Sequence, residues 1–424
     1  MLTLKYIQEN PQAVIDGLAK KLFDAGTIVH SIVSLIETKN QTQVKADKAK
    51  AEMNTIAKEI GMLMRVGKTD EANQAKEYTA QLKDTIRDLD QVFASADEKI
   101  YELLILLPNL PHSSVPWGKS PEDNELVRSG GTLPVLQEEA LPHWDLATKY
   151  NLIDFELGVK LTGAGFPVYR GKGARLQRAL INFFLDEARK MGFEEIQPPF
   201  LVNEASGFGT GQLPDKEGQM YHATLDNFYL IPTAEVPVTN IYRDEILDAK
   251  DLPVKNVAYS ACFRREAGSH GKDVRGLNRL HQFDKVEIVQ VAHPDTSYEI
   301  LEEMVSYVES LVTKLELPYR IIKLCGGDMG FTSAMTYDFE VWSAAQQMWL
   351  EVSSVSNFES FQANRLKLRY REEAGKKPQL AHTLNGSALA LPRIMAALLE
   401  NNQTSNGISI PKALVPWCGF DLID

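Results

Sequence analysis

Residues 262–287 read CFRREAGSHGKDVRGLNRLHQFDKVE and hold six Lys or Arg in a chain whose formal net charge is −12. The two ends of this segment have the composition of strands, which predicts a hairpin in which residues 281–291 return beside the first strand. Arg264 and Glu266 are two residues apart and would share one face of that strand. The loop between the strands is expected to be a flexible, cationic flap that suits a polyanion. It carries Lys272, Arg275 and Arg279 among Gly268, Gly271 and Gly276.

Further strand-like runs occur on both sides of this hairpin, and they do not alternate regularly with helices. The runs cover residues 228–231, 257–260, 285–291, 319–323 and 349–355. A helix is expected from Leu176 to Met191, where apolar residues recur at helical spacing up to Gly192. The sequence therefore predicts an α+β domain with a largely antiparallel sheet rather than a doubly wound parallel sheet.

The N-terminal part follows a heptad-like pattern in two segments, which is typical of coiled coils. Its apolar positions are Ala46, Ala49, Met53, Ile56, Ile60 and Leu63, and then Ile86, Leu89, Phe93, Ala96, Ile100 and Leu103. Turn residues at 67–70 predict two long helices folded back as an antiparallel hairpin. A helix of roughly 37 residues would be ~55 Å long, so the hairpin is expected to project as an arm. By periodicity alone, a dimerisation coiled coil or a scaffold is the more common function of such a hairpin.

Length and composition indicate an ordinary soluble globular protein of two or three domains. The chain has 424 residues, of which 44% are hydrophobic and 24% charged. Its N-terminus lacks the features of a signal peptide, and its longest apolar run, LLILL at residues 103–107, is too short to span a bilayer. We therefore expect a cytoplasmic protein without a membrane partner. Cys262, Cys325 and Cys418 are widely separated, which favours buried thiols over disulfides or a structural zinc site.

Taken one at a time, the residues of the hairpin have ordinary explanations. An Arg in a sheet is more often a surface or salt-bridge residue than a phosphate ligand. Phe283 is more often part of a core than a stacking platform. Neither the P-loop pattern nor the GxGxxG pattern occurs, so a nucleotide would not be bound by either of those phosphate loops.

Longer motifs resemble those of a known enzyme family. FRREAGS (residues 263–269) is similar to the second signature motif of class II aminoacyl-tRNA synthetases, and NGSALALPRIMAALLENNQ (residues 385–403) is similar to the third. FEEIQPPFLV, with Pro198, resembles the first motif, which in that family belongs to the dimer interface. TGQLP (210–214), TAE (233–235), QFDKVE (282–287) and EVSSVSNFESFQANR (351–365) resemble the bacterial type of the seryl-tRNA synthetase family. The resemblance covers essentially the whole chain.

The resemblance implies a fold, a reaction and a set of partners. The fold would be the class II antiparallel β-sheet flanked by helices, with a tRNA-binding helical arm domain at residues 1–108 and a catalytic domain at 109–424 that includes a linker at 109–125. The enzyme would use ATP, with Mg²⁺, to activate L-serine as seryl-adenylate. It would then transfer the seryl group to the 3′ end of tRNA(Ser), with tRNA(Sec) as a second candidate, and it would act as a homodimer.

The same resemblance implies an ATP site. Arg264 would hold the α-phosphate and the serine carboxylate, Glu266 would contact the adenine amino group, and Phe283 would stack on the adenine ring. Arg393 would reach the γ-phosphate from the start of a helix. Glu351 would bind Mg²⁺, with Ser354 beside it. A carboxylate together with phosphate oxygens is the expected set of ligands for this ion. The implied ATP site comprises Arg264, Arg265, Glu266, Phe283, Glu351, Val352, Ser353, Ser354 and Arg393, of which Arg264, Glu351 and Arg393 are the catalytic residues.

A serine site is implied as well. Thr233, Ala234 and Glu235 would surround the α-amino group, and Glu287 and Ser387 would face the side-chain hydroxyl. A site that hydrogen-bonds a substrate hydroxyl rejects the analogue lacking it by ~10⁴ to 10⁵, so alanine should be excluded without editing, and threonine by lack of space. The residues also have ordinary explanations: Thr233 as a turn residue, Glu287 as the polar face of a strand, and Ser387 as a helix cap.

Some details depart from the family pattern. Leu391 and Pro392 precede Arg393 where the family commonly has Gly, Ala388 replaces another common Gly, and the loop at residues 163–167 differs in sequence. Pro is well tolerated at a first helical position, so the helix is expected to form. Two other functions stay open. An amino acid:carrier-protein ligase belongs to relatives that lack the arm, and a non-catalytic synthetase paralogue should have lost some ATP or Mg²⁺ residues.

Overall fold

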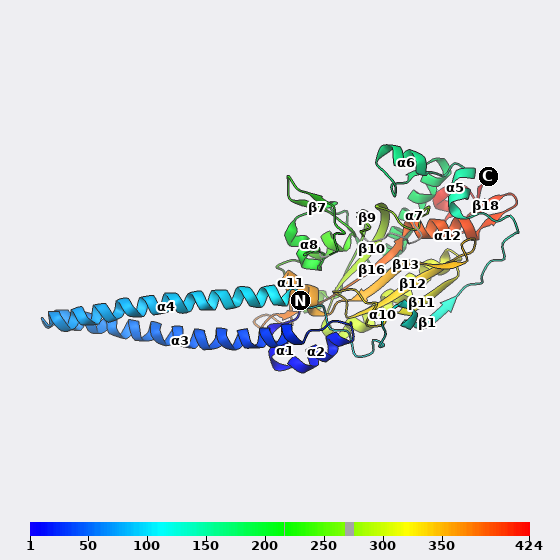
Figure 1. Ribbon diagram of the computed structural model, residues 1–424. Helices are drawn as coiled ribbons and strands as arrows, with labels where there is room; N and C mark the ends of the chain where they lie inside the picture. Colours follow the sequence, from blue (N-terminus) through cyan, green and yellow to red (C-terminus); the bar gives the residue numbers. More distant parts are fainter. Residues whose placement is uncertain (216, 268–274) are drawn as a thin grey trace. The chain divides into compact units, whose positions relative to one another are not determined.

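The computed structural model describes residues 1–215, 217–267 and 275–424, and these form two compact units. The first unit is Met1–Leu110 and the second is Pro111–Asp424 (Figure 1). The middle of the predicted cationic loop, including Gly268, Gly271 and Lys272, lies outside the described residues. No helix in the described part of the chain is both long enough and apolar enough to cross a bilayer.

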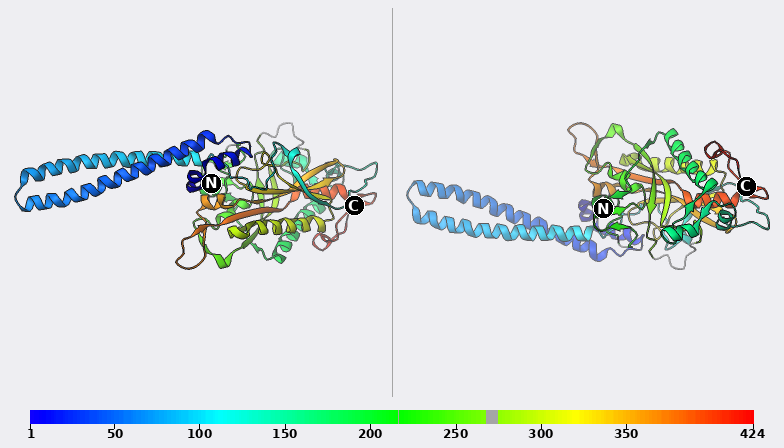
Figure 2. Two further views of the ribbon diagram at one scale, coloured as in Figure 1. Left: turned by 90° about the horizontal axis from the view of Figure 1, so that it is seen from below. Right: turned by 90° about the horizontal axis from the view of Figure 1, so that it is seen from above.

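The first unit is helical. It comprises α1 (Leu4–Glu9), α2 (Pro11–Ala19), α3 (Gly26–Arg65) and α4 (Thr69–Leu104). α3 and α4 lie side by side and antiparallel in every view (Figures 1 and 2), which confirms the predicted helical arm. The turn between them contains Gly67, whose φ of +74° favours glycine.

The seam between α3 and α4 follows the heptad pattern. Ala49 packs against Leu82 and Ile86, and all three side chains are buried. Polar pairs also bridge the two helices: Lys50 Nζ lies 3.1 Å from Asp90 Oδ1, and Lys39 contacts Asp97. The helix begins well before the expected seam, because Val29, Ile32 and Ile36 continue the buried stripe toward its N-terminus.

The second unit is built on an eight-stranded sheet with the order β1-β11-β12-β13-β16-β10-β9-β4. Neighbouring strands are antiparallel except β4 and β9, which confirms the predicted α+β class. Its strands are β1 (Glu125–Gly130), β4 (Glu194–Glu195), β9 (Val254–Phe263), β10 (Gln282–Ala292), β11 (Tyr319–Lys323), β12 (Met335–Ser343), β13 (Met348–Asn357) and β16 (His382–Ala390).

Smaller elements surround this sheet. The helices are α5 (His143–Lys149), α6 (Phe155–Leu161), α8 (Glu204–Thr210), α9 (Glu235–Asn240), α11 (Ser360–Leu366), α13 (Val415–Cys418) and the 3₁₀ turns η1 (Pro121–Asp123), η2 (Ala249–Asp251) and η3 (Pro294–Thr296). The small sheets are β2 (Ile153–Asp154) with β3 (Val168–Tyr169); β5 (Leu201–Val202), β6 (His222–Ala223) and β7 (Phe228–Leu230); β8 (Ile246–Asp248), β14 (Arg369–Arg371) and β15 (Gln379–Leu380); and β17 (Gln403–Thr404), β18 (Gly407–Ser409) and β19 (Leu422–Ile423). All five predicted strand-like runs are strands, although β7 belongs to a small sheet.

The two faces of the large sheet have different neighbours. Helices α7 (Gly171–Lys190), α10 (Ser297–Lys314) and α12 (Leu391–Asn401) form the main core with one face (Figure 1). Along β10, Val286 and Ile288 belong to this core, whereas Val289 and Val291 pack with α9 and α11. Because side chains alternate along a strand, Lys285 and Glu287 share the face of Val289 and Val291. Lys285 and Glu287 therefore lie on the face opposite the main core.

Two predictions about single residues have clear outcomes. The three cysteines are free and buried, as expected. The prediction that Arg264 and Glu266 share one face of a strand is wrong, because β9 ends at Phe263 and Glu266 has a φ of +49°, outside the β region. The backbone N–H of Arg265 donates to the Gln219 carbonyl at 2.9 Å, which draws the chain away from β10.

Candidate active site

Glu287 is the centre of a buried polar cluster on β10 and β16. Its side chain is 1% exposed, and its Oε2 lies 2.7 Å from Lys285 Nζ. Asn385 donates to Glu287 Oε1 at 3.0 Å, and the Ser387 hydroxyl donates to Oε2 at 3.4 Å. Glu287 is therefore not on a polar solvent face, and Ser387, in the middle of β16, is not a helix cap.

A second buried carboxyl group, that of Glu235, begins α9. The Thr233 hydroxyl accepts a hydrogen bond from the Glu235 N–H at 3.2 Å, so Thr233 does serve as a turn residue. Gln362 donates to Glu235 Oε1 at 2.7 Å, and Gln362 is itself oriented by a bond from the Thr383 hydroxyl at 2.7 Å. Burial, reinforced by the nearby Glu287 carboxylate, raises the pKa of Glu235 to about 7.

Arg264 lies where β9 leaves the sheet. Its guanidinium carbon is 5.2 Å from the centroid of the Phe283 ring, and its Nε donates to the Pro232 carbonyl at 3.4 Å. Glu266 forms an ion pair with Arg279, with 2.6 Å between Oε2 and Nη1. Arg264, Phe283 and Glu266 are thus brought together at the stem of the cationic loop, although Glu266 reaches this place through a turn and not along a strand.

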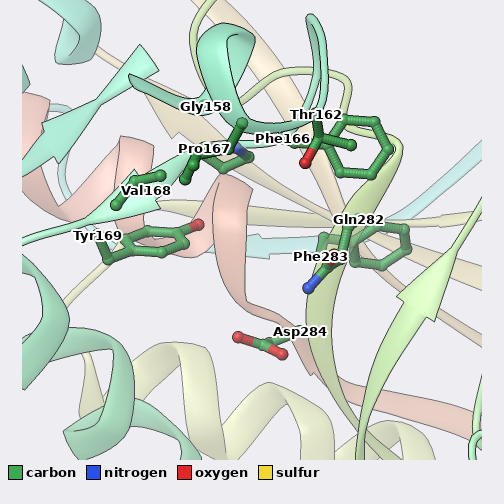
Figure 3. Close-up of a pocket in the computed structure, with 10 residues that line it drawn as sticks. Gly158, Thr162, Phe166, Pro167, Val168, Tyr169, Gln282, Phe283 and Asp284 are labelled. Carbon is green, nitrogen blue, oxygen red and sulfur yellow. The ribbon is translucent and has the colours of Figure 1, made fainter. Parts of the chain in front are cut away.

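Two cavities flank this stem. One of about 200 Å³ lies between the start of β10 and residues 158–169, with Phe283 and Phe166 at its border (Figure 3). The other, of about 540 Å³, lies between α5, α6 and residues 275–280. The larger volume falls within the range of roughly 300 to 1,000 Å³ that small-molecule sites occupy.

The loop at residues 163–167 separates these cavities and contacts the stem. The His281 N–H donates to the Gly165 carbonyl at 2.9 Å. The Phe166 and His281 rings are stacked with centroids 5.4 Å apart. This loop, whose sequence departs from the family pattern, therefore supports His281, the residue just before β10.

An acidic group lies on β12 and β13. The Ser354 hydroxyl donates to Asp338 Oδ1 at 2.6 Å and lies 3.5 Å from Glu351 Oε1. Burial and the neighbouring Glu351 carboxylate raise the pKa of Asp338 well above its ordinary value. By contrast, the Val352 side chain belongs to the main core and the Ser353 hydroxyl donates to the Ser387 carbonyl at 2.6 Å. The side chains of those two residues thus point away from this acidic group.

Arg393 lies next to the acidic group, in the first turn of α12 after Pro392. The helix forms despite the Leu391-Pro392 sequence, as predicted. Arg393 Nη1 donates to the Glu351 carbonyl at 2.8 Å, and its Nε donates to the Asn278 carbonyl at 3.1 Å. The side chain is therefore held between β13 and the C-terminal end of the cationic loop. Ala388, the other departure from the family pattern, is fully buried in the main core.

Sequence reasoning missed several polar residues of the site. They are Lys285, Asn385, Gln362 and Asp338, each of which contacts a residue named from the motifs. Alternation could have identified Lys285, which is two residues from Glu287, and Asn385, which is two from Ser387. Asp338 had no signal in the sequence, because only the register of β12 and β13 places it opposite Ser354.

Within the described residues, no group of three or more His, Cys, Asp or Glu side chains is arranged to hold a metal ion. The donor set of Glu351, Ser354 and Asp338 nevertheless fits Mg²⁺, which prefers oxygen ligands and usually binds through one or two carboxylates together with substrate phosphates. Because burial, together with Glu351, raises the pKa of Asp338, a bound cation would favour the charged form of this carboxyl group.

Comparisons with known proteins match both units of the chain. Residues 1–111 match the family model described as seryl-tRNA synthetase N-terminal domain, and residues 221–402 match the tRNA synthetase class II core domain (G, H, P, S and T). The serine–tRNA ligase of Salinibacter ruber is 51% identical over 99% of this chain and 98% of its own length. That of Chlorobaculum parvum is 46% identical over 100% of both chains.

A solved structure gives the same result. The crystal structure of seryl-tRNA synthetase from Pyrococcus horikoshii complexed with ATP has a TM-score of 0.96 and 35% identity to this chain, and it covers 100% of this chain and 99% of its own. Because these matches extend through both units, the chain belongs to the seryl-tRNA synthetase family, the class II serine–tRNA ligases.

Proposed function

We propose residue roles for the two steps by which this serine–tRNA ligase works. In the first step a serine carboxylate oxygen attacks the α-phosphorus of ATP and pyrophosphate leaves. In the second step the 3′-terminal hydroxyl of tRNA(Ser) attacks the seryl carbonyl and AMP leaves. Both steps depend on positioning and on stabilising charge, which are the contributions that fixed polar side chains supply.

Serine is recognised by the two buried carboxyl groups. Glu287, held by Lys285, Asn385 and Ser387, accepts a hydrogen bond from the serine hydroxyl. Glu235, together with Thr233 and the adjoining Ala234, binds the α-ammonium group. Because Glu235 has a pKa of about 7, a bound cation stabilises its charged form. Without the serine hydroxyl, Glu287 would lose a partner, which disfavours alanine.

ATP is bound around Arg264. Its guanidinium holds the α-phosphate and the serine carboxylate, Phe283 stacks on the adenine, and Glu266 accepts from the adenine amino group, with Arg265 beside it. Arg393 binds the γ-phosphate. Val352 and Ser353 contribute through their backbone, because their side chains point elsewhere. Glu351, Ser354 and Asp338 hold Mg²⁺, which when bound supplies charge neutralisation to the phosphates.

The helical arm suggests a tRNA partner, and the first motif suggests a second subunit. The helical arm domain, residues 1–108, binds tRNA(Ser), and tRNA(Sec) is a second candidate. Residues 109–424 form the catalytic domain. The first motif surrounds β4, which is the edge strand of the large sheet, and this supports a homodimer formed through that edge. The enzyme works in the cytoplasm.

The single observation that carries the serine assignment is the buried Glu287 cluster beside Glu235. The test is amino-acid-dependent ATP–pyrophosphate exchange with serine, threonine, alanine and cysteine. It is followed by transfer to total tRNA and to an acyl carrier protein. Exchange with serine alone and charging of tRNA support the proposal. Thiol transfer without tRNA charging would indicate a carrier-protein ligase, and a folded protein without exchange would indicate a non-catalytic paralogue.

A further inference from the structure

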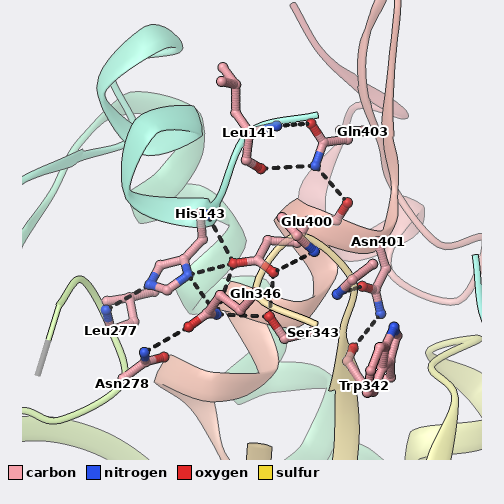
Figure 4. Close-up of polar contacts among 12 residues, drawn as sticks. Leu141, His143, Leu277, Asn278, Trp342, Ser343, Gln346, Glu400, Asn401 and Gln403 are labelled. Carbon is pink, nitrogen blue, oxygen red and sulfur yellow. Dashed lines mark hydrogen bonds and ion pairs between the residues drawn. The ribbon is translucent and has the colours of Figure 1, made fainter. Parts of the chain in front are cut away.

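A buried polar network surrounds the side chains of His143 and Glu400 (Figure 4). His143, at the start of α5, and Glu400, in the last turn of α12, both have side chains that are 0% exposed. Glu400 accepts five hydrogen bonds. The donors are the His143 N–H (3.0 Å), His143 Nδ1 (2.8 Å), Gln346 Nε2 (2.9 Å), the Ala345 N–H (3.2 Å) and the Ser343 hydroxyl. With this many donors, the negative charge of the carboxylate is balanced by hydrogen bonds and its position is fixed.

The partners of His143 define its protonation. The Leu277 N–H donates to His143 Nε2 at 2.9 Å, so Nε2 is the acceptor and the ring proton is on Nδ1, which donates to Glu400. Nε2 therefore accepts from the loop backbone and Nδ1 donates to Glu400, while Gln346 Nε2 lies 3.3 Å from Nδ1. His143 links the end of α12 directly to the backbone of the C-terminal end of the cationic loop.

The network reaches Arg393 through that loop end. Gln346 accepts a hydrogen bond from Asn278 Nδ2 at 2.8 Å, and the Asn278 carbonyl accepts from Arg393 Nε at 3.1 Å. Leu277 and Asn278 are thus both tied to the Glu400 network, one through its N–H and the other through its side chain. Arg393 and Glu400 are seven residues apart on α12, so they lie on the same side of the helix.

The loop end fits closely against α5. Gly276 has a φ of +66°, and a Cβ there would lie 2.2 Å from His143 Nε2. The Arg275 guanidinium lies 4.7 Å from the Trp144 ring centroid. A side chain at residue 276 would therefore collide with the His143 ring, so the loop end passes directly against the imidazole.

We propose that His143, held by Glu400, is a positioning residue for ATP: it fixes Leu277 and Asn278 and thereby aims Arg393 at the phosphates. The inference rests on the proposed role of Arg393 in phosphate binding. The His143 side chain is fully buried, so its effect would pass through the loop end.

Two substitutions separate the two bonds of the imidazole. His143→Asn keeps a donor in the place of Nδ1 for Glu400 but removes the acceptor of the Leu277 N–H. His143→Gln places an amide oxygen near Nε2, which keeps the bond to Leu277 and removes the donor to Glu400. We expect His143→Asn to raise the KM for ATP in pyrophosphate exchange by about tenfold, with the KM for serine unchanged. His143→Gln should keep the ATP KM within about threefold of the parent protein.

If His143 had a purely structural role, the two variants would not differ in their KM for ATP. Both lose one buried hydrogen bond and should be destabilised similarly. Thermal unfolding of both variants gives that comparison. Equal KM values for ATP in the two variants, or a parallel rise in the KM for serine, would overturn the proposal.

Arg393→Ala provides the second comparison. If His143 acts through Arg393, His143→Asn should have no further effect on the ATP KM in the Arg393→Ala background. A persisting effect contradicts the inference but leaves the role of Arg393 intact. An Arg393→Ala variant with the parental ATP KM overturns both. If His143→Asn does not fold, Gln346→Leu replaces it with the same expected rise in the ATP KM. This variant keeps His143 but removes the bonds of Gln346 to Asn278, Glu400 and Ser343.

Discussion

The two acidic groups of the site differ in what neutralises them. Glu287 is buried and is already paired within the protein, with Lys285, Asn385 and Ser387 as donors. Glu351 is 51% exposed, and Arg393 is 3.9 Å from its carboxylate, while the adjacent Asp338 has a raised pKa. In the proposed assignment, the protein itself preforms the serine side, whereas a bound cation would complete the phosphate side. Removing the carboxylate should therefore reduce both stability and activity on the first side, but activity alone on the second.

The largest effect is expected from Glu287→Ala. It leaves Lys285, whose side chain is 8% exposed, without its partner. Removing one member of a buried ion pair costs about 3–5 kcal/mol of unfolding free energy. Denaturant unfolding should show this loss, and serine-dependent exchange should disappear. As a control, Lys285→Met combined with Glu287→Leu should recover stability without recovering exchange. Unchanged stability of Glu287→Ala would remove the contrast between the two sides.

Glu351→Gln should behave in the opposite way. The side chain is half exposed, so the unfolding free energy should change by less than about 0.5 kcal/mol. ATP–pyrophosphate exchange should fall by about 10²-fold or more, as when one group that stabilises transition-state charge is removed. Glu303→Gln, at an exposed acid on α10, is the matched control and should leave the rate unchanged. A large loss of stability in Glu351→Gln would show that this side is also preformed.

Glu235 gives a pH dependence that distinguishes it from Glu287. With a pKa of about 7 it gains charge between pH 6 and pH 8, and kcat/KM for serine should rise roughly tenfold over that range. The stability of the free protein should change in the opposite direction. Because the folded-state pKa is raised from 4.5 to about 7, the contribution of Glu235 to stability is present below pH 4.5 and is lost as the pH rises to about 7.

The matched variant is Glu235→Gln. It should have a flat kcat/KM profile from pH 6 to pH 8 and should lose the fall in stability between pH 4.5 and 7. Stopped exchange assays and urea unfolding at several pH values measure both. A variant that keeps the parental pH profile would assign the titration to another group.

The smallest effect is expected from Ser387→Ala. Its hydroxyl lies 3.4 Å from Glu287, which has two shorter contacts to Lys285 and Asn385. Loss of one such bond is worth about 0.5–1.5 kcal/mol, so kcat/KM for serine should fall by roughly two- to tenfold with little change in stability. A loss as large as that of Glu287→Ala would mean that Ser387 contacts serine more directly than Glu287 does.

Much of the fold could be predicted because local patterns determine it. The heptad spacing of α3 and α4 indicates which side of each helix is buried. The strand-like runs indicate segments whose side chains alternate between the two faces of a sheet. The helix expected at residues 176–191 is α7, which starts five residues earlier at Gly171. The motif residues Arg264, Glu287, Glu351 and Arg393 all lie in the second unit near the loop stem or the acidic group.

The sequence by itself determined the helical arm, the antiparallel class and the residues named from the motifs, because these depend on short-range periodicity and on long matching segments. Only the tertiary structure decided that Lys285 and Asn385 complete Glu287, that Asp338 faces Ser354, and that His143 supports the loop end. It also decided that Arg264 and Glu266 do not share one face of a strand. Each of these depends on strand register or on a contact between residues far apart in the chain, and no local spacing encodes such a contact.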